Sequence, residues 1–304
     1  MAVGHARAAL WRRRSLLRAW GACCAFGALA WVQTAEAAGQ AVASQDGPLD
    51  AELVRTGLYL IRGGGGNSLL RLSANGMILV DGKLPGTHRA LMSQVRRISR
   101  LSDMPIRVLV LTDHLEAHAG DCAQFMAAGV TVVAQRETVA RLGLAGPDDA
   151  SARLRVIAYD DQRTLRMGGV EVQLRHWGPA RTGGDTVVHF PDLKVVALGD
   201  LFATEAPEPS FSAGGSLAGW GAVLGRVLEL DFDWVVPGSG PVASRDDLVA
   251  FKERVDAVAT RAGALVRAGV GKDALMARLR SDDLGWQLDY SGPALDGFFA
   301  ELSR

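Results

Sequence analysis

Cysteine is scarce in this chain, with three among 304 residues. Cys23 and Cys24 lie near the amino terminus, and Cys122 lies in the body of the chain. A disulfide framework of the kind that stabilises small secreted domains is therefore excluded. In AGDCAQFMAAG, Cys122, Phe125 and Met126 follow helical i, i+3, i+4 spacing, which predicts a buried apolar residue rather than a catalytic thiol.

An excess of charge of either sign is also missing. Lys and Arg total 33, Asp and Glu total 33, and the formal net charge is zero. A protein that binds nucleic acid or an anionic membrane surface normally carries a basic surplus. We therefore expect neither partner, and no membrane contact in the mature form.

No apolar run reaches the roughly 20 residues of a comfortable membrane span. The amino terminus instead predicts a signal peptide, because five arginines precede an apolar run over 19–32 and Ala35-Glu36-Ala37 forms a small-x-small cleavage site. Arg13-Arg14 fits a twin-arginine export signal, with Sec-type export as the alternative. We expect cleavage near Ala37 and a periplasmic or secreted protein.

Three segments follow from this: a signal peptide over 1–37, a mobile amino-terminal segment over 38–51, and one domain over 52–304. Within the domain, strand-like stretches recur as LYLIR, NSLLRLS, GMILVDG, IRVLVLT and VTVVAQ, then as EVQLRHW, TVVHFP, KVVALGD and DWVVPGSG. Apolar spacing predicts helices over 88–101, 217–230, 246–268 and in the closing segment. Strand runs mixed with helices in two similar halves predict an α+β fold, an αββα sandwich, although a doubly wound sheet fits the composition too.

Four segments, in order, resemble the metallo-β-lactamase fold superfamily, in its exported hydrolase-like branch. They are GGGGNSLLRLSANGMILVDGKLP, AGDCAQFMAAGVTVVAQRETVARL, HWGPARTGGDTVVHFPDLKVVALGDLF and DWVVPGSGPVASRDDL. The resemblance implies an αββα sandwich of the metallo-β-lactamase type over essentially the whole mature chain. It also implies a T-H-x-H-x-D-H-x-G loop, a GPAHT turn, a GD at a strand end and a GHG turn, whose side chains hold one or two Zn²⁺ ions beside an open position for water.

The chain departs from that ligand pattern at five of seven positions, and only His118 and Asp200 are retained. The replacements are Asp113 and Leu115 for the two loop histidines, Ala117 for the loop aspartate, Arg181 for the GPAHT histidine and Ser239 for the GHG histidine. Leu115 and Ala117 cannot coordinate a metal, and the protonated Arg181 repels one.

These replacements predict a degenerate zinc site with no metal. We expect the guanidinium of Arg181 to take the electrostatic place of the ion, with Asp113 and Asp200 converging on it and His118 as a further partner. The alternative is an altered single-metal site, with zinc held by Asp113, His118 and Asp200. In that alternative His114 or Glu116 supplies a fourth ligand.

The functional expectation is an exported pseudoenzyme: a non-catalytic binding or partner protein that uses the former active cleft. That cleft, bordered by a loop over 203–215, would take a small polar or anionic ligand. Its expected lining is Asp113, His114, Glu116, His118, Arg181, Asp200 and Ser239. The alternatives are a metal-dependent hydrolase of a small ester, lactam or thioester, and an inactive subunit paired with an intact homologue through its carboxyl-terminal helices.

Overall fold

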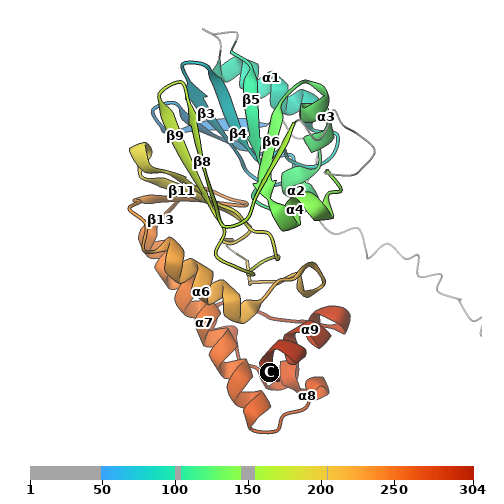
Figure 1. Cartoon of the computed structure of the whole chain (residues 1–304). Coiled ribbons are helices and arrows are strands. Elements are labelled where there is room, and N and C mark those ends of the chain that lie inside the picture. The colour runs from blue at the N-terminus through green and yellow to red at the C-terminus, as the bar shows by residue number, and fades with distance from the viewer. Residues whose placement is uncertain (1–48, 100–103, 145–154, 204) are drawn as a thin grey trace, which may run out of the picture. The chain divides into compact units, whose positions relative to one another are not determined.

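The computed structural model describes residues 49–99, 104–144, 155–203 and 205–304 (Figure 1). The chain divides into Met1–Val42 and Ala43–Arg304, and the first part lies wholly outside the described residues. The predicted signal peptide therefore stays a prediction, as does most of the predicted mobile segment. Within the described residues no helix is both long and apolar enough to cross a membrane.

Two sheets form the framework of Ala43–Arg304, and their strands come largely from separate halves of it. The first has seven strands in sequence order, antiparallel from β1 to β4 and parallel from β4 to β7. Its strands are β1 (Asp50–Arg55), β2 (Leu58–Arg62), β3 (Ser68–Ser73), β4 (Gly76–Val80), β5 (Ile106–Val110), β6 (Thr131–Gln135) and β7 (Val156–Tyr159).

The second sheet has six strands in the order β13-β12-β11-β10-β9-β8, with only the β11–β12 pair parallel. Its strands are β8 (Gln162–Met167), β9 (Val170–Arg175), β10 (Val187–Phe190), β11 (Val195–Gly199), β12 (Trp234–Pro237) and β13 (Ala243–Ser244).

Helices cover the outer face of each sheet. Those associated with the first sheet are α1 (His88–Ile98), α2 (Glu116–Ala119), α3 (Cys122–Ala127) and α4 (Arg136–Arg141). Those of the second half are α6 (Leu217–Val227), α7 (Arg245–Arg267), α8 (Lys272–Arg278) and α9 (Gly292–Leu302), with short 3₁₀ turns η1 (Pro191–Leu193), η2 (Phe211–Ala213) and η3 (Asp282–Leu284).

Three apolar clusters separate these layers and explain why the central strands are apolar throughout. In β3, Leu69 belongs to the cluster between the two sheets, whereas Leu70 packs in the cluster between the first sheet and its helices. Successive side chains of a strand point to opposite faces, so a strand with both faces covered carries apolar residues at every position. A third cluster joins the second sheet to α6 and α7, with Trp220 and Phe251 buried in it. The predicted αββα sandwich is confirmed.

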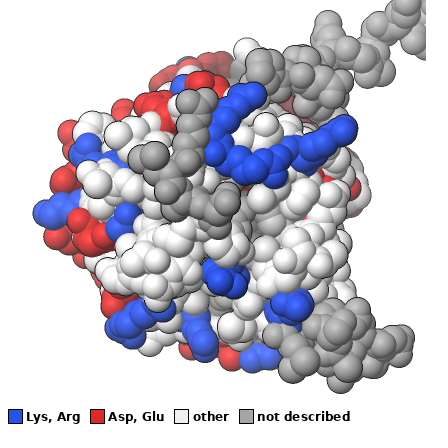
Figure 2. Space-filling view, turned by 90° about the horizontal axis from the view of Figure 1, so that it is seen from above, with Lys and Arg blue, Asp and Glu red and all other residues white. Residues whose placement is uncertain are grey.

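The structure corrects the predicted elements at the edges of the sheets. Strand β1 begins at Asp50, so the last two residues of the segment predicted to be mobile, Asp50 and Ala51, are extended and paired with β2. Strands β7 and β8 and helix α4 were not predicted. Cys122 and Phe125 are buried in α3, as the helical spacing indicated. On the face drawn in Figure 2, Asp and Glu lie mainly along the left and upper margins, Lys and Arg are scattered over the face, and neither sign covers it.

Candidate functional site: a buried histidine among carboxylates

The site lies where strands of both sheets end. Asp81 follows β4 and Asp113 lies three residues beyond β5, and these two strands are parallel neighbours. Asp200 follows β11 and Ser239 follows β12, again parallel neighbours. Carboxyl ends of parallel strands open onto a common edge, which is where such sheets bind ligands. Four polar side chains distant in sequence are thereby placed at one end of the sandwich.

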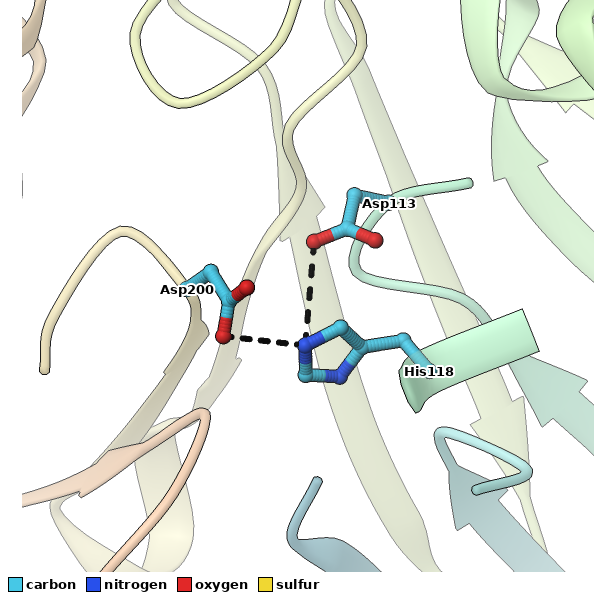
Figure 3. A group of neighbouring side chains, drawn as sticks. All are labelled: Asp113, His118 and Asp200. Carbon is cyan, nitrogen blue, oxygen red and sulfur yellow. Dashed lines mark hydrogen bonds and ion pairs between the residues drawn. The ribbon is translucent and has the colours of Figure 1, made fainter. Parts of the chain in front are cut away.

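His118, carried by the short helix α2, lies at the centre of this group (Figure 3). Its Nδ1 atom is 2.9 Å from Asp81 Oδ2, and its Nε2 atom is 3.0 Å from Asp200 Oδ1. Asp113 Oδ2 lies 3.9 Å from the same Nε2 atom. The imidazole is fully buried, so carboxylates rather than water meet both of its nitrogens.

Asp81 fixes the orientation of the imidazole. One oxygen of its carboxylate accepts a hydrogen bond from Thr112 N at 2.8 Å, and the other accepts one from Thr112 Oγ1 at 2.7 Å. Asp81 has a left-handed backbone with φ of 63°, which turns the chain sharply after β4. The opposite side of the ring lies against Gly66, where a Cβ atom would be 2.8 Å from His118 Cε1. This residue ends the run Gly63 to Gly66, which forms a tight bend.

Burial and mutual attraction shift the proton affinities of the group. Burial alone would lower the pKa of His118, but attraction by Asp113 and Asp81 and hydrogen bonds with Asp200 and Asp81 together raise it well above its ordinary value. Burial raises the pKa of Asp113 to about 6, and the nearby Asp200 and Asp81 add to this against the opposing attraction of His118. Burial also acts to raise the pKa of Asp200, yet contacts with His118 and Arg181 bring it below the usual range.

The prediction that Arg181 replaces the ion is corrected by this geometry. Arg181 Nε lies 3.8 Å from Asp200 Oδ2, and its NH1 group donates to the main-chain oxygen of Glu208. Within the described part of the chain Arg181 forms no ion pair with Asp113. The imidazole of His118, being smaller and attached to the floor of the site, fills the central position instead. Arg181 neutralises one side of Asp200 from the rim.

The remaining predicted residues are dispersed. Ser239 lines the cleft beside Asp200. Glu116 is exposed at the first position of α2 and does not join the carboxylate group. His114 is half-buried, and its Nδ1 atom has no hydrogen-bond partner among the described residues. Burial lowers the pKa of His114, and the positive charges of Arg141 and Arg181 add to the effect against the opposing attraction of Glu137. His114 does not belong to the group of possible metal ligands formed by Asp113, His118 and Asp200.

The cleft itself is a pocket of about 220 Å³ above Asp200. Trp220 and Phe251 border the pocket but are almost wholly buried in the apolar core. The loop predicted to border the cleft supplies several of the other lining residues. Its lining is Arg181, Asp200, Ala203, Glu205, Ala206, Pro207, Glu208, Trp220, Ser239 and Phe251. A second pocket of about 280 Å³ shares Arg181 and Glu208 and extends toward Pro293.

Sequence reasoning missed both the buried aromatic residues beside the pocket and Lys83. Trp220 and Phe251 occur inside helices, where an aromatic residue ordinarily indicates core packing. Lys83 is fully buried, and its Nζ donates to the main-chain oxygens of Ile61 at 2.9 Å and Gly66 at 2.8 Å. Burial lowers the pKa of Lys83 to about 7, although Asp81 opposes the change. The amine thus anchors the glycine bend that contacts His118.

Solved structures with the same arrangement of strands and helices are metallo-β-lactamases. One from Pontibacter korlensis matches with a TM-score of 0.58 at 19% identity, over 68% of this chain and 99% of that one. FIM-1 from Pseudomonas aeruginosa, solved in its mono-zinc form, matches with a TM-score of 0.58 at 18% identity, over 70% of this chain and 96% of that one. The chain has the metallo-β-lactamase fold.

At this level of identity the metallo-β-lactamase structures show the fold alone. No family model matches the chain. Among curated proteins, the chain is similar to the 2,4-dinitroanisole O-demethylase subunit alpha of Nocardioides sp. (strain JS1661). The two are 27% identical over 231 residues, which cover 74% of this chain and 68% of that protein.

Metallo-β-lactamases are typically zinc-dependent, so the donor set must be compared with what zinc requires. Ligand atoms of Asp113, His118 and Asp200 all lie within 4.8 Å of one another. A metal-bound histidine usually donates its other ring N–H to a carboxylate, and Asp81 occupies that position on His118 Nδ1. The three residues therefore fit one divalent cation that keeps open coordination positions. The expectation of no metal is not confirmed by this geometry.

Proposed function

We propose that the chain is a metal-dependent hydrolase with an altered single-cation site formed by Asp113, His118 and Asp200. The observation that carries the proposal is that ligand atoms of these three side chains lie within 4.8 Å of one another, with the Nδ1 atom of His118 held by Asp81. Two carboxylates and one imidazole suit zinc and related divalent ions.

Charge balance supports the same proposal. Asp81, Asp113 and Asp200 contribute three carboxylates to a largely buried group, and Arg181 contributes one cation at its rim. Among these four charges and His118 alone, a neutral His118 with one divalent cation brings the total to zero, whereas a protonated His118 leaves one negative charge uncompensated. Uncompensated charge in a protein interior is costly, so the group favours the ion over the proton.

Each residue of the chain has a separate task in this proposal. A bound divalent cation supplies Lewis-acid chemistry, polarising an oxygen of water or substrate. Asp81 holds the imidazole of His118 so that Nε2 faces the cation position. Arg181, with its side chain 20% exposed at the rim of the cleft, binds a polar group of the substrate.

The pocket indicates a small substrate. Its volume of about 220 Å³ is below the usual range for drug-sized ligands, and Ala203 and Ala206 are the half-buried apolar residues of its lining. Three lining carboxylates, Asp200, Glu205 and Glu208, outnumber Arg181, which favours a neutral polar substrate over an anionic one. The related O-demethylase is named for a small aryl methyl ether. A small ester or aryl ether, cleaved by water to an alcohol or phenol and its partner product, is the substrate class that we propose.

A second candidate function, a metal-free binding or partner protein, is supported by one contact. His118 Nε2 and Asp200 Oδ1 are 3.0 Å apart, so a proton held between them would occupy the lone pair that a metal requires. In this form the cleft binds a small polar molecule without cleaving it. The curated relative is named as a subunit, which fits a protein partner. Export to the periplasm by a cleaved leader is proposed for either candidate.

Elemental mass spectrometry on untagged mature protein separates the two candidates. We expect about one divalent ion per chain in the wild type and in His114→Ala, which changes a neighbouring histidine outside the group. Asp200→Asn keeps the size of a partly exposed side chain, and it should lose that ion, as should His118→Ala. Metal content near zero after supplementation with zinc and manganese would overturn the proposal and leave the metal-free binding protein.

Hydrolysis needs its own assay, since a bound ion alone does not establish catalysis. We expect the wild type to cleave aryl esters or aryl methyl ethers of one-ring size, and Asp200→Asn to lose the activity while keeping its fold by circular dichroism. Equal rates in both proteins would contradict the assignment of the reaction to this cleft.

A further inference from the structure

A groove of about 510 Å³ lies away from the cleft, between the carboxyl-terminal half of α7 and the segment that joins α8 to η3. None of its lining residues lines the cleft around Asp200. Its lining is Arg261, Ala264, Leu265, Arg278, Arg280 and Asp283. Three arginines and one aspartate thus surround a wall of small aliphatic side chains.

The charges of the groove are only partly paired. Arg261 forms a bidentate ion pair with Asp283, with both N–O distances at 2.6 Å, and also donates to the main-chain oxygen of Arg280 at 2.8 Å. These bonds hold the segment after α8 against α7. Arg261 and Asp283 cancel each other, so they add no net charge to the groove.

Arg278 and Arg280 remain as the free cations of the groove. Both are exposed, and in the described ranges neither guanidinium has a hydrogen bond or ion pair. Arg280 is near enough to Asp283 to add its attraction to the stronger contact of Arg261, which lowers the pKa of that carboxyl. The groove therefore has a surplus of two positive charges beside Ala264 and Leu265.

We propose that this groove binds a small amphipathic carboxylate. The aliphatic tail lies along Ala264 and Leu265, and the carboxylate is held by Arg278 and Arg280. Arginine presents a planar fork of donors that matches a carboxylate in bidentate geometry. The volume falls within the range of small-molecule sites. The surplus charge favours an anion, and the aliphatic wall favours an alkyl chain over a bare inorganic ion.

Calorimetric titration of the full mature chain tests this, with octanoate, octanol and inorganic phosphate as the three probes. Octanoate should bind at one site per chain. Octanol and phosphate should each bind about tenfold more weakly or worse, because octanol lacks the carboxylate and phosphate lacks the alkyl chain. Equal binding of octanol would reduce the site to an apolar surface. Equal binding of phosphate would reduce it to an adventitious ion only. Absence of octanoate binding would also overturn the proposal.

Variants locate the site. The double variant Arg278→Gln/Arg280→Gln should weaken octanoate binding by about tenfold or more, since charged hydrogen bonds to the carboxylate are lost. Arg267→Gln is the matched control, because Arg267 ends the same helix α7 without lining the groove. Asp200→Asn should also bind octanoate normally. Weakening in either control, or none in the double variant, would refute the groove as the site.

Discussion

Asp81→Asn is the most informative single change, because it removes one negative charge and turns one accepting oxygen into an NH2 donor while keeping the size of the side chain. Asp81 is 3% exposed and accepts hydrogen bonds from Thr112 N, Thr112 Oγ1 and His118. Asparagine preserves the size of the side chain and tolerates the left-handed backbone at this position. In the metal-free protein, where His118 carries its proton, removing its buried ion-pair partner typically costs about 3 kcal/mol or more. For a domain of this size, that lowers the unfolding midpoint by about 6–12 °C.

Thermal unfolding followed by circular dichroism measures this effect, with Asp160→Asn as the matched control. Asp160 forms a bidentate ion pair with Arg136, with N–O distances of 2.6 and 2.9 Å, but both side chains are 64% exposed. Exposed pairs contribute little, so the control should unfold with the wild type. The reasoning would be refuted if Asp81→Asn unfolded together with Asp160→Asn, because Asp81 would then not be compensating a buried charge.

Three further predictions concern the surroundings of His118. Arg181→Ala should lower the unfolding free energy by only about 1 kcal/mol in chemical denaturation, because the contact of Arg181 with Asp200 is long and partly exposed. The same change removes a cation near the zinc position, so it should strengthen zinc binding in a competition titration. A large loss of stability, or weaker zinc binding, would contradict this. Lys83 is neutral in the folded chain above pH about 7, but in the unfolded chain it stays protonated up to about 10.5. Between these two pH values the unfolded chain therefore binds more protons than the folded chain, and the unfolding free energy should rise with pH. Lys83→Met should flatten that rise in denaturation curves measured from pH 7.5 to 10, and an unchanged slope would show that the amine stays charged when folded. Gly66→Ala should displace the ring of His118 and weaken zinc binding about tenfold or more, and unchanged affinity would contradict the close approach of the glycine bend.

The central strands could be predicted from the sequence because both of their faces are buried. LYLIR and IRVLVLT are apolar runs for that reason, and the structure places them at β2 and β5. The edge strands could not be predicted in the same way. In QRTLRM, which forms β8, most side chains are exposed or half-buried, and β1 is similarly polar. An edge strand pairs on one side only, so its composition resembles that of a loop.

The gathering of Asp113, His118 and Asp200 was also predictable, since each residue follows a strand at the same edge of the sandwich. The sequence could not predict which cation lies among the carboxylates, because the choice between His118 and Arg181 depends on side-chain reach over a few ångströms. Lys83 gives no signal in the sequence. Its burial depends on two main-chain oxygens, of Ile61 and Gly66, that only the folded bend brings to its amine.

A crystal of the mature chain grown with zinc, measured across the zinc absorption edge, tests the central claim most directly. We expect one anomalous peak per chain, about 2.0–2.2 Å from a carboxylate oxygen of Asp113, from His118 Nε2 and from a carboxylate oxygen of Asp200. In the same crystal His118 Nδ1 should remain hydrogen-bonded to Asp81. A fully formed site without any anomalous peak, with His118 still bonded to Asp200, would contradict the single-cation account.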